Sequence, residues 1–312
     1  MSRILLLRPG ALGDLLLTVP ALISLRSRLP NTHITLVGHA EATALLCETA
    51  LVDEGISQDD RRLLGLFTVK GPPHSEAESL GGFDTAVGWL SDREGVVAAN
   101  LHRLGAKTVK IVPSTPAMDA GIHVADYLAA TLSFLGVASP SRMVLSLRAS
   151  SRGEQWARSC LATYNPAGQP VVILHPGSGS ARKNWPAECF AAVAEILTAK
   201  GAVVLVLSGP ADAQVVRAMT SRLSHSLPIL SDAPLSGLAG LFARCSAYLG
   251  NDSGITHLAG LAGAPVVALF GPTDPAVWGP RGARVTTLRW QAKEGELPPE
   301  KVAHTLCQIY SA

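Results

Sequence analysis

The sequence lacks several features that would assign it to large protein classes. Its formal net charge is only +2, which does not favour strong nucleic-acid binding. Its five cysteines are widely spaced and form no C-x-x-C pair, so we expect reduced thiols in a cytoplasmic protein. Its apolar stretches fall short of the roughly 20 residues of a membrane span, and no amphipathic membrane anchor stands out. The first apolar run is interrupted by Arg8, Pro9 and Asp14, so we expect no signal peptide.

Motifs of several enzyme classes are also missing. The first glycine-rich turn, residues 10–13, is G-x-x-G and not the G-x-G-x-x-G of dinucleotide-binding domains. The stretch 177–184 departs from a phosphate-binding P-loop, because Arg182 precedes the lysine and Asn184 follows it. The chain has no G-x-S-x-G nucleophile elbow and no D-x-D. These absences disfavour a nicotinamide dehydrogenase, a nucleoside triphosphatase and a serine hydrolase.

The length of the chain and its alternating strand and helix patterns predict two α/β domains. The chain has 312 residues, 47% of them hydrophobic, which suits two cores of ordinary size. Strands are predicted at 3–8, 33–39, 83–90 and 107–113, with helices at 15–29 (Pro20 as a kink or break), 41–48, 95–104 and 124–136. The second half repeats the alternation, with strands at 171–177, 202–210, 247–252 and 265–272 and helices at 186–201, 211–223, 234–245 and 253–263. It begins with the stretch 150–170, which is predicted to run from a helix into a connector that contains proline and glycine. We therefore expect domains at 1–150 and 151–312, with ligands bound where parallel strands end.

A strand in the second half ends in the stretch "HPGSGSARKNWP", residues 175–186. Its small residues permit close backbone approach, and their N–H and hydroxyl groups suit phosphate oxygens. Lys183 would neutralise a diphosphate. The alternative is a solvated loop with a surface cation pair.

A later strand runs into "GNDSGITHLAG", residues 250–260, where a helix is predicted to begin at Asp252 or Ser253. The N–H groups at a helix start favour an anion, and Ser253, Gly254 and Thr256 are placed to approach phosphate oxygens. His257 lies one turn further on. The alternatives are that Asp252 only caps the helix and that His257 is structural.

Two further stretches have both a functional and a structural interpretation. The loop 270–282 contains Thr273 and Asp274 and is either a ligand-binding loop or a rigid turn. Asp14, at the start of the first helix, is either a general base facing a cleft or a helix-terminal carboxylate stabilised by the helix dipole.

Taken together and in this order, "RPGALGDLLLTVPAL", "LHPGSGSARKNWP", "GNDSGITHLAG" and "ALFGPTDPAVWGP" resemble glycosyltransferase family 9, the heptosyltransferase family. The resemblance implies a GT-B fold, in which two Rossmann-like, doubly wound parallel-sheet domains enclose an interdomain cleft. The N-terminal domain would bind the acceptor and the C-terminal domain the nucleotide sugar. The last helix, about 299–310, would pack back on the N-terminal domain.

The resemblance also implies roles for individual residues. Asp14 matches the family's proposed base, and Lys183 matches the lysine that neutralises the donor diphosphate. Asp212 falls near the family's ribose-binding glutamate, but it is shorter and one position later, which leaves the choice of nucleotide open. The remaining donor-binding residues would be Ser178, Gly179, Leu235, Asp252, Ser253, Gly254, Thr256 and His257, with Leu235 beside adenine. Acceptor-binding residues would be Arg8, Gly10 and Gly13.

The function implied is inverting, metal-independent transfer of heptose from ADP-heptose to the inner core of lipopolysaccharide, with no cofactor. Expected partners are the nucleotide-sugar donor and a lipid-linked oligosaccharide acceptor, with no nucleic acid. The location would be cytoplasmic, with transient contact at the inner face of the inner membrane left open. Two alternatives remain: a GT-B enzyme with another donor or acceptor, and a non-catalytic nucleotide-sugar-binding relative.

Overall fold

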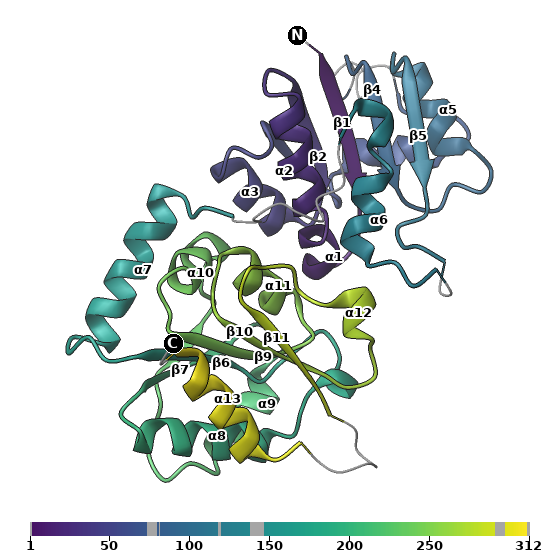
Figure 1. The fold of residues 1–312 in the computed structure, drawn as a ribbon. Helices are drawn as coiled ribbons and strands as arrows, with labels where there is room; N and C mark the ends of the chain where they lie inside the picture. The colour runs from purple at the N-terminus through teal and green to yellow at the C-terminus, as the bar shows by residue number, and fades with distance from the viewer. Residues whose placement is uncertain are drawn as a thin grey trace. The chain divides into compact units, whose positions relative to one another are not determined.

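The computed structural model describes residues 2–73, 80, 82–117, 120–137, 147–290 and 297–310. The chain divides into two compact units, Met1–Met143 and Val144–Ala312 (Figure 1). Each unit contains one sheet, and all the strand pairs described in both sheets are parallel. The predicted fold class, two Rossmann-like α/β units, is therefore confirmed. In the described part of the chain, no helix is both long and apolar enough to cross a membrane.

The sheet of the first unit has the order β3-β2-β1-β4-β5. Its strands are β1 (Arg3–Arg8), β2 (His33–Gly38), β3 (Glu54–Ser57), β4 (Thr85–Trp89) and β5 (Thr108–Val112). Its helices are α1 (Leu12–Leu16), α2 (Val19–Arg28), α3 (Ala40–Glu48), α5 (Val96–Arg103) and α6 (Val124–Ala130), with 3₁₀ helices η1 (Arg61–Phe67) and η2 (Ser133–Leu135). The apolar run of β1 occupies the centre because a strand covered on both faces needs apolar side chains in both directions.

Successive side chains of β1 enter opposite cores of this unit. Leu5 and Leu7 pack in a cluster with residues of α5 and η1, while α2 and α6 pack together on the other face (Figure 1). Arg8 continues the alternation on the side of Ile4 and Leu6. The last residue of the central strand is thus a cation directed toward a covered face of the sheet.

Three local differences from the sequence prediction have simple causes. The first helix breaks before Pro20, which becomes the second residue of α2, where its missing N–H costs no hydrogen bond. The predicted helix 124–136 ends as α6 at Ala130, and the 3₁₀ helix η2 then runs to a left-handed Gly136 (φ 73°). Strand β3 was not predicted, because its sequence EGIS has one buried apolar residue and no apolar run.

The sheet of the second unit has the order β11-β10-β9-β6-β7-β8. Its strands are β6 (Val171–His175), β7 (Val203–Ser208), β8 (Ile229–Ser231), β9 (Ala247–Asn251), β10 (Val266–Phe270) and β11 (Val285–Arg289). Its helices are α7 (Ser151–Tyr164), α8 (Ala187–Ala199), α9 (Ala213–Thr220), α10 (Leu235–Phe242), α11 (Gly254–Leu261), α12 (Pro275–Trp278) and α13 (Pro299–Tyr310), with the 3₁₀ turn η3 (Ala181–Lys183). The edge strands β8 and β11 were not predicted, since both are short or partly exposed.

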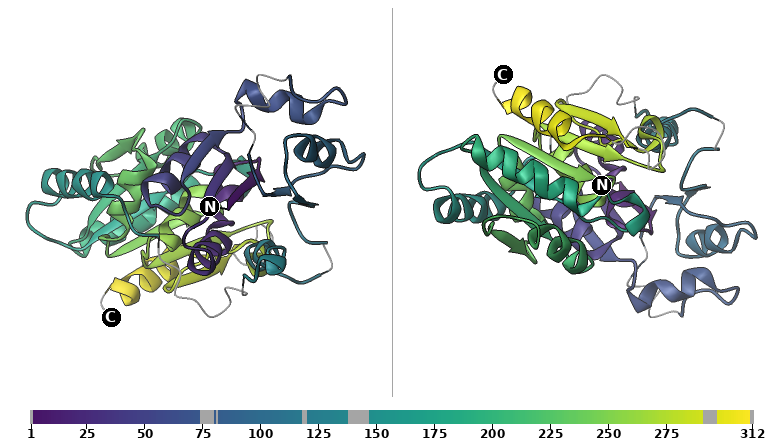
Figure 2. Two further views of the ribbon diagram at one scale, coloured as in Figure 1. Left: turned by 90° about the horizontal axis from the view of Figure 1, so that it is seen from above. Right: turned by 90° about the horizontal axis from the view of Figure 1, so that it is seen from below.

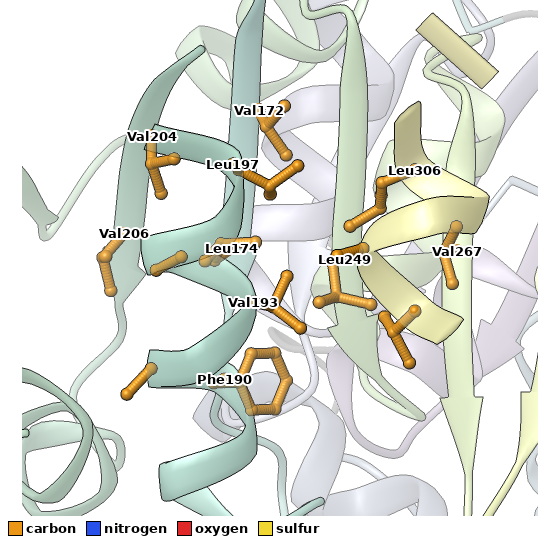
Figure 3. Packing of buried hydrophobic residues seen from close by; sticks show 14 of the residues in the cluster. Val172, Leu174, Phe190, Val193, Leu197, Val204, Val206, Leu249, Val267 and Leu306 are labelled. Carbon is orange, nitrogen blue, oxygen red and sulfur yellow. The ribbon is translucent and has the colours of Figure 1, made fainter. Parts of the chain in front are cut away.

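One face of this sheet carries α8, α9 and α13, and the other carries α10 and α11 (Figure 1). Phe190, Val193 and Leu197 of α8 pack on the valines and leucines of β6, β7 and β9, and Leu306 of α13 lies beside them (Figure 3). The buried side of α13 is thus part of the core of the second unit. The expected packing of this helix on the first unit stays a prediction.

Candidate active site

The start of α1 in the first unit holds Asp14 in a defined position. Ala11 is the N-cap residue, and Asp14 at the third helical position accepts the Ala11 N–H at 3.0 Å through Oδ2. This is the acidic half of a capping box. The other oxygen, Oδ1, lies 3.5 Å from Nη2 of Arg8, and the Asp14 side chain is 36% exposed. The carboxylate therefore caps its helix and still presents surface to solvent.

Arg8 lies almost completely buried next to this carboxylate. Only 2% of its surface is exposed, and neither Nε nor Nη2 has a hydrogen-bond partner. Burial lowers the pKa of the guanidinium, and the charge of Asp14 partly opposes that effect. Because a buried charge with few partners is costly, the ion pair with Asp14 is its main compensation.

Gly10 allows the chain to pass close to Asp14. Its φ of +142° lies in the region that favours glycine, and a Cβ there would come within 2.9 Å of Oδ2 of Asp14. The Gly10 N–H donates to Oε1 of Gln58 at 2.8 Å. Gly13 is the second residue of α1. The sequence did not predict the hydrogen bond between Gly10 and Gln58, because the two residues are 48 positions apart in the chain.

In the second unit, Lys183 and Asp252 form an ion pair. Nζ of Lys183 lies 2.8 Å from Oδ2 of Asp252, whose side chain is only 6% exposed. The hydroxyl of Thr273 donates to the same oxygen at 2.7 Å. The lysine at the end of the 175–186 loop is thus held beside the start of α11 by a buried carboxylate.

Ser253, and not Asp252, is the N-cap residue of α11. Its Oγ accepts the N–H of Thr256 at 3.3 Å, as a serine cap does. The Thr256 hydroxyl in turn donates to the carbonyl of Asn251 and lies 3.0 Å from the hydroxyl of Tyr248. Gly254 is the first residue of the helix. Asp252 is therefore free of the capping role and acts as the partner of Lys183.

Behind Ser253 lies a buried histidine–aspartate pair that the sequence analysis did not assign. Nε2 of His175 is 3.0 Å from Oδ2 of Asp212, and Nδ1 of His175 is 3.3 Å from Oγ of Ser253. The Gly209 N–H donates to the same Asp212 oxygen at 2.7 Å. Burial by itself would raise the pKa of Asp212, but the His175 contact and the Gly209 amide outweigh it and lower that pKa. The carboxylate predicted near the ribose is thus engaged by the protein.

The two glycines of the loop 175–186 differ in the space that is available for a side chain. A Cβ on Gly177 would lie 1.8 Å from Oδ1 of Asp212, so only glycine fits there. A Cβ on Gly179 would meet no atom within 4 Å, so the space beside it is open. The Ser178 hydroxyl lies 2.6 Å from Oδ1 of Asn184 and 2.8 Å from the Ser180 carbonyl. Ser178 therefore shapes the loop, and Gly179 leaves room beside it.

Asn251, at the end of β9, holds the loop 175–186 in place through its side chain. Its Oδ1 accepts the N–H of Trp185 at 2.9 Å, and its Nδ2 donates to the carbonyl of Pro176 at 2.8 Å. Asn251 is completely buried. Both ends of the loop that carries Lys183 are therefore tied to the strand that leads into α11. The signal for this role was the asparagine that ends an otherwise apolar strand.

The other predicted residues lie on the same unit. Leu235 is the buried first residue of α10, and His257 is buried in α11. Asp274 caps α12 by accepting the N–H of Ala276, which fits the alternative of a rigid turn for its loop. Oδ1 of Asp274 also lies 3.7 Å from Nη1 of Arg289. Among the residues that the structure describes, no group of three histidine, cysteine or acidic side chains is arranged to hold a metal ion.

Comparison of the chain with known proteins identifies the family to which it is similar. The model of glycosyltransferase family 9 (heptosyltransferase) matches residues 108–304. Lipooligosaccharide heptosyltransferase 2 of Haemophilus influenzae is 32% identical over 136 residues, which are 41% of this chain and 38% of that protein. Lipopolysaccharide heptosyltransferase 3 of Escherichia coli is 22% identical over 317 residues, covering 92% of this chain and 88% of that protein. The chain thus matches less than half the length of the first relative and most of the second.

A solved structure shows the same fold. It is that of E. coli ADP-heptose lipopolysaccharide heptosyltransferase II, with a TM-score of 0.77, 22% identity and coverage of 100% of this chain and 99% of that chain. This likeness supports the predicted GT-B fold class. Because the family model matches more than half of the residues, the chain belongs to glycosyltransferase family 9.

Proposed function

We propose that the protein is an inverting, metal-independent glycosyltransferase that moves heptose from ADP-heptose to the inner core of a lipopolysaccharide. The observation that carries this proposal is Lys183 beside the start of α11, within a chain that belongs to the heptosyltransferase family. The names of the relatives supply the substrate class: two act on lipooligosaccharide or lipopolysaccharide, and the solved structure is that of an ADP-heptose enzyme.

The second unit would bind the donor through its diphosphate. Lys183 would exchange its contact with Asp252 for phosphate oxygens, which are also anionic acceptors of its N–H groups. Gly254 and Thr256 are at the N-terminus of α11, where the helix dipole favours the same charge. The open space beside Gly179 would take part of the ligand. The remaining proposed contacts are Ser178, Ser253 and His257 at the phosphates, Leu235 at adenine and Asp212 toward the ribose.

The first unit would supply the base. In an inverting transfer, an acceptor hydroxyl oxygen attacks the anomeric carbon, the bond from that carbon to the ADP oxygen breaks, and the hydroxyl proton goes to a base. Asp14 would accept that proton, since its carboxylate is partly exposed and is fixed by Ala11 and Arg8. Gly10 and Gly13 would leave space for the acceptor on the same turn.

Charge that develops on departing ADP needs stabilisation. Lys183 and the N-terminus of α11 provide positive charge and N–H donors, which is why we propose transfer without a metal ion. Addition of a chelator to the purified enzyme should therefore leave turnover unchanged.

A second function, transfer of a different nucleotide sugar, is favoured by one observation. Asp212 is held by His175 and Gly209, and ribose is common to ADP, UDP and GDP, so a contact of Asp212 with ribose would not select the base. Thermal shifts with ADP, UDP and GDP test this point, followed by transfer assays with the matching heptose and hexose donors. Selective protection by ADP and transfer from ADP-heptose support our proposal. Selective protection by UDP or GDP would replace it with the second function.

A further inference from the structure

His175 ends the central strand β6 and is buried on the face of the sheet that carries α11. Val172 and Leu174 of β6 lie in the core under α8, on the face that also carries α13, the yellow helix in both views of Figure 2. Side chains alternate along a strand, so His175 points to the opposite face. Only 4% of its surface is exposed. Each of its ring nitrogens therefore needs a hydrogen-bond partner within the protein.

Asp212 fixes a proton on Nε2 of this ring. Its Oδ2 lies 3.0 Å from Nε2 of His175 and also accepts the Gly209 N–H at 2.7 Å. The lowered pKa of Asp212 keeps its carboxylate ionised at neutral pH, and an ionised carboxylate only accepts hydrogen bonds. Nε2 is therefore the donor. Asp212 occupies the N-cap position of α9, but its side chain makes no capping bond there, because the carboxylate is turned toward His175.

The other ring nitrogen, Nδ1, lies 3.3 Å from Oγ of Ser253. In a neutral imidazole with its proton on Nε2, Nδ1 is an acceptor. The contact is satisfied when the Ser253 hydroxyl donates to Nδ1. Oγ of Ser253 then keeps a lone pair for the N–H of Thr256, which it accepts at 3.3 Å. One imidazole thus sets the direction of the hydroxyl that caps α11.

The neighbouring hydroxyls support this direction of the Ser253 proton. The Thr256 hydroxyl donates to the carbonyl of Asn251, so its oxygen is the acceptor for the fully buried Tyr248 hydroxyl at 3.0 Å. Oγ of Ser253 also lies 3.1 Å from that oxygen. Because Tyr248 already donates there, Nδ1 of His175 is the better acceptor for the Ser253 proton.

The start of α11 depends on this proton. The N–H groups in the first turn of a helix have no acceptor within the helix, and Ser253 takes the N–H of Thr256. The N–H groups of Gly254 and Ile255 lie in the same turn, where an anion is favoured. Without the acceptor on His175, the Ser253 hydroxyl could rotate away from Thr256. The first turn would then lose the bond that fixes its geometry.

We propose that His175 is a positioning residue for the diphosphate of the donor. Held at Nε2 by Asp212, it holds the Ser253 hydroxyl at Nδ1 and thereby keeps the first turn of α11 in the geometry that receives phosphate oxygens. The proposal rests on the donor site of the proposed function. It requires a nucleoside diphosphate, but neither a particular base nor a particular sugar.

Two substitutions separate the two ring nitrogens. His175→Gln keeps a donor that can reach Asp212 and removes the acceptor for Ser253. His175→Asn keeps an acceptor at the position of Nδ1 and removes the group that reaches Asp212. We expect His175→Gln to weaken ADP binding about tenfold and His175→Asn to recover most of that loss. The order of stability should be the reverse, because His175→Asn leaves the buried Asp212 carboxylate without the ring N–H.

Isothermal titration calorimetry with ADP and thermal denaturation measure the two effects. The control His304→Gln, which changes an exposed histidine of α13, should match the wild type in both. Opposite orders of affinity and stability in the two His175 variants support the proposal. Loss of affinity that follows the loss of stability would overturn it, since His175 would then have a structural role alone.

The tautomer of His175 gives a second readout, which requires no variant to fold. In protein labelled with ¹⁵N-histidine and assigned through its backbone, the His175 ring should carry a proton on Nε2 and none on Nδ1 at pH 8. A proton on Nδ1 would overturn the proposal, because Nδ1 could not then accept from Ser253.

These measurements use no sugar donor. If the wild type binds UDP or GDP in place of ADP, the same comparison is made with that nucleotide. Absence of heptose transfer, together with the expected order of affinities, would refute the proposed function and leave the role of His175 intact. Heptose transfer by the wild type with a proton on Nδ1 would refute the role of His175 alone.

Discussion

Lys183 and Asp252 pair at 2.8 Å, although they come from separate loops at the ends of β6 and β9. The pair places a cation beside the N-terminus of α11. The carboxylate of Asp252 also neutralises the lysine charge that would otherwise bind a diphosphate. Binding of the donor therefore exchanges one carboxylate for phosphate oxygens. In this account, Asp252 competes with the ligand while it keeps the lysine in place.

Substitution of the two partners should change ADP affinity in opposite directions. Lys183→Ala should weaken ADP binding about tenfold or more, because a charge-assisted contact is lost. Asp252→Asn should tighten it about two- to fivefold, because a competing charge of modest strength is removed while the Thr273 hydroxyl keeps an acceptor. Isothermal titration calorimetry measures both. Weaker binding in both variants would show that Asp252 contacts the ligand directly.

Gly177 and Gly179 form a matched pair of substitutions two residues apart. Gly177→Ala should destabilise the protein by about 1 to 3 kcal/mol, because its Cβ would overlap the Asp212 carboxylate at 1.8 Å. Gly179→Ala should change the free energy of unfolding by less than about 0.5 kcal/mol, since nothing surrounds its Cβ. If the donor fills that space, Gly179→Ala should instead raise the KM for the donor. Urea denaturation and steady-state kinetics separate the two effects, and equal loss of stability in both variants would contradict the structure.

Asp212 should make stability depend on pH in the acidic range. Its pKa is lowered in the folded state relative to its ordinary value of 3.8. The stability it contributes is therefore complete above that ordinary value and is lost as the pH falls through the lower folded-state pKa. Asp212→Asn should cost about 1 to 3 kcal/mol at pH 7, and the difference from the wild type should shrink below about pH 4. Urea denaturation at pH 7 and pH 3 tests this, and a difference that grows on acidification would refute it.

Arg8 should be more important for activity than for folding. Arg8→Met removes a buried, poorly partnered guanidinium, so the free energy of unfolding should be unchanged or should rise by about 1 kcal/mol. Turnover should nevertheless fall at least tenfold, because Asp14 loses the partner that orients it. Arg8→Lys should recover part of the rate. Thermal denaturation and kcat measurements decide this point, and parallel loss of stability and activity would assign Arg8 a purely structural role.

The sequence predicted the main architecture because buried parallel strands are continuous apolar runs and their helices follow at regular spacing. It also predicted that Asp14, Lys183 and Ser253 follow strand ends, since that depends only on chain order. It could not predict the Lys183–Asp252 pair or the contact of His175 with Asp212, because loops from different strands meet only in the folded sheet.

The assignment of Asp14 as the base is the central claim, and Asp14→Asn tests it with least disturbance. Asparagine can still accept the Ala11 N–H, so α1 should keep its capped start. With ADP-heptose and a lipopolysaccharide inner-core acceptor, we predict that kcat falls about 10²- to 10⁴-fold while ADP affinity is unchanged. A kcat within tenfold of the wild type would contradict the account.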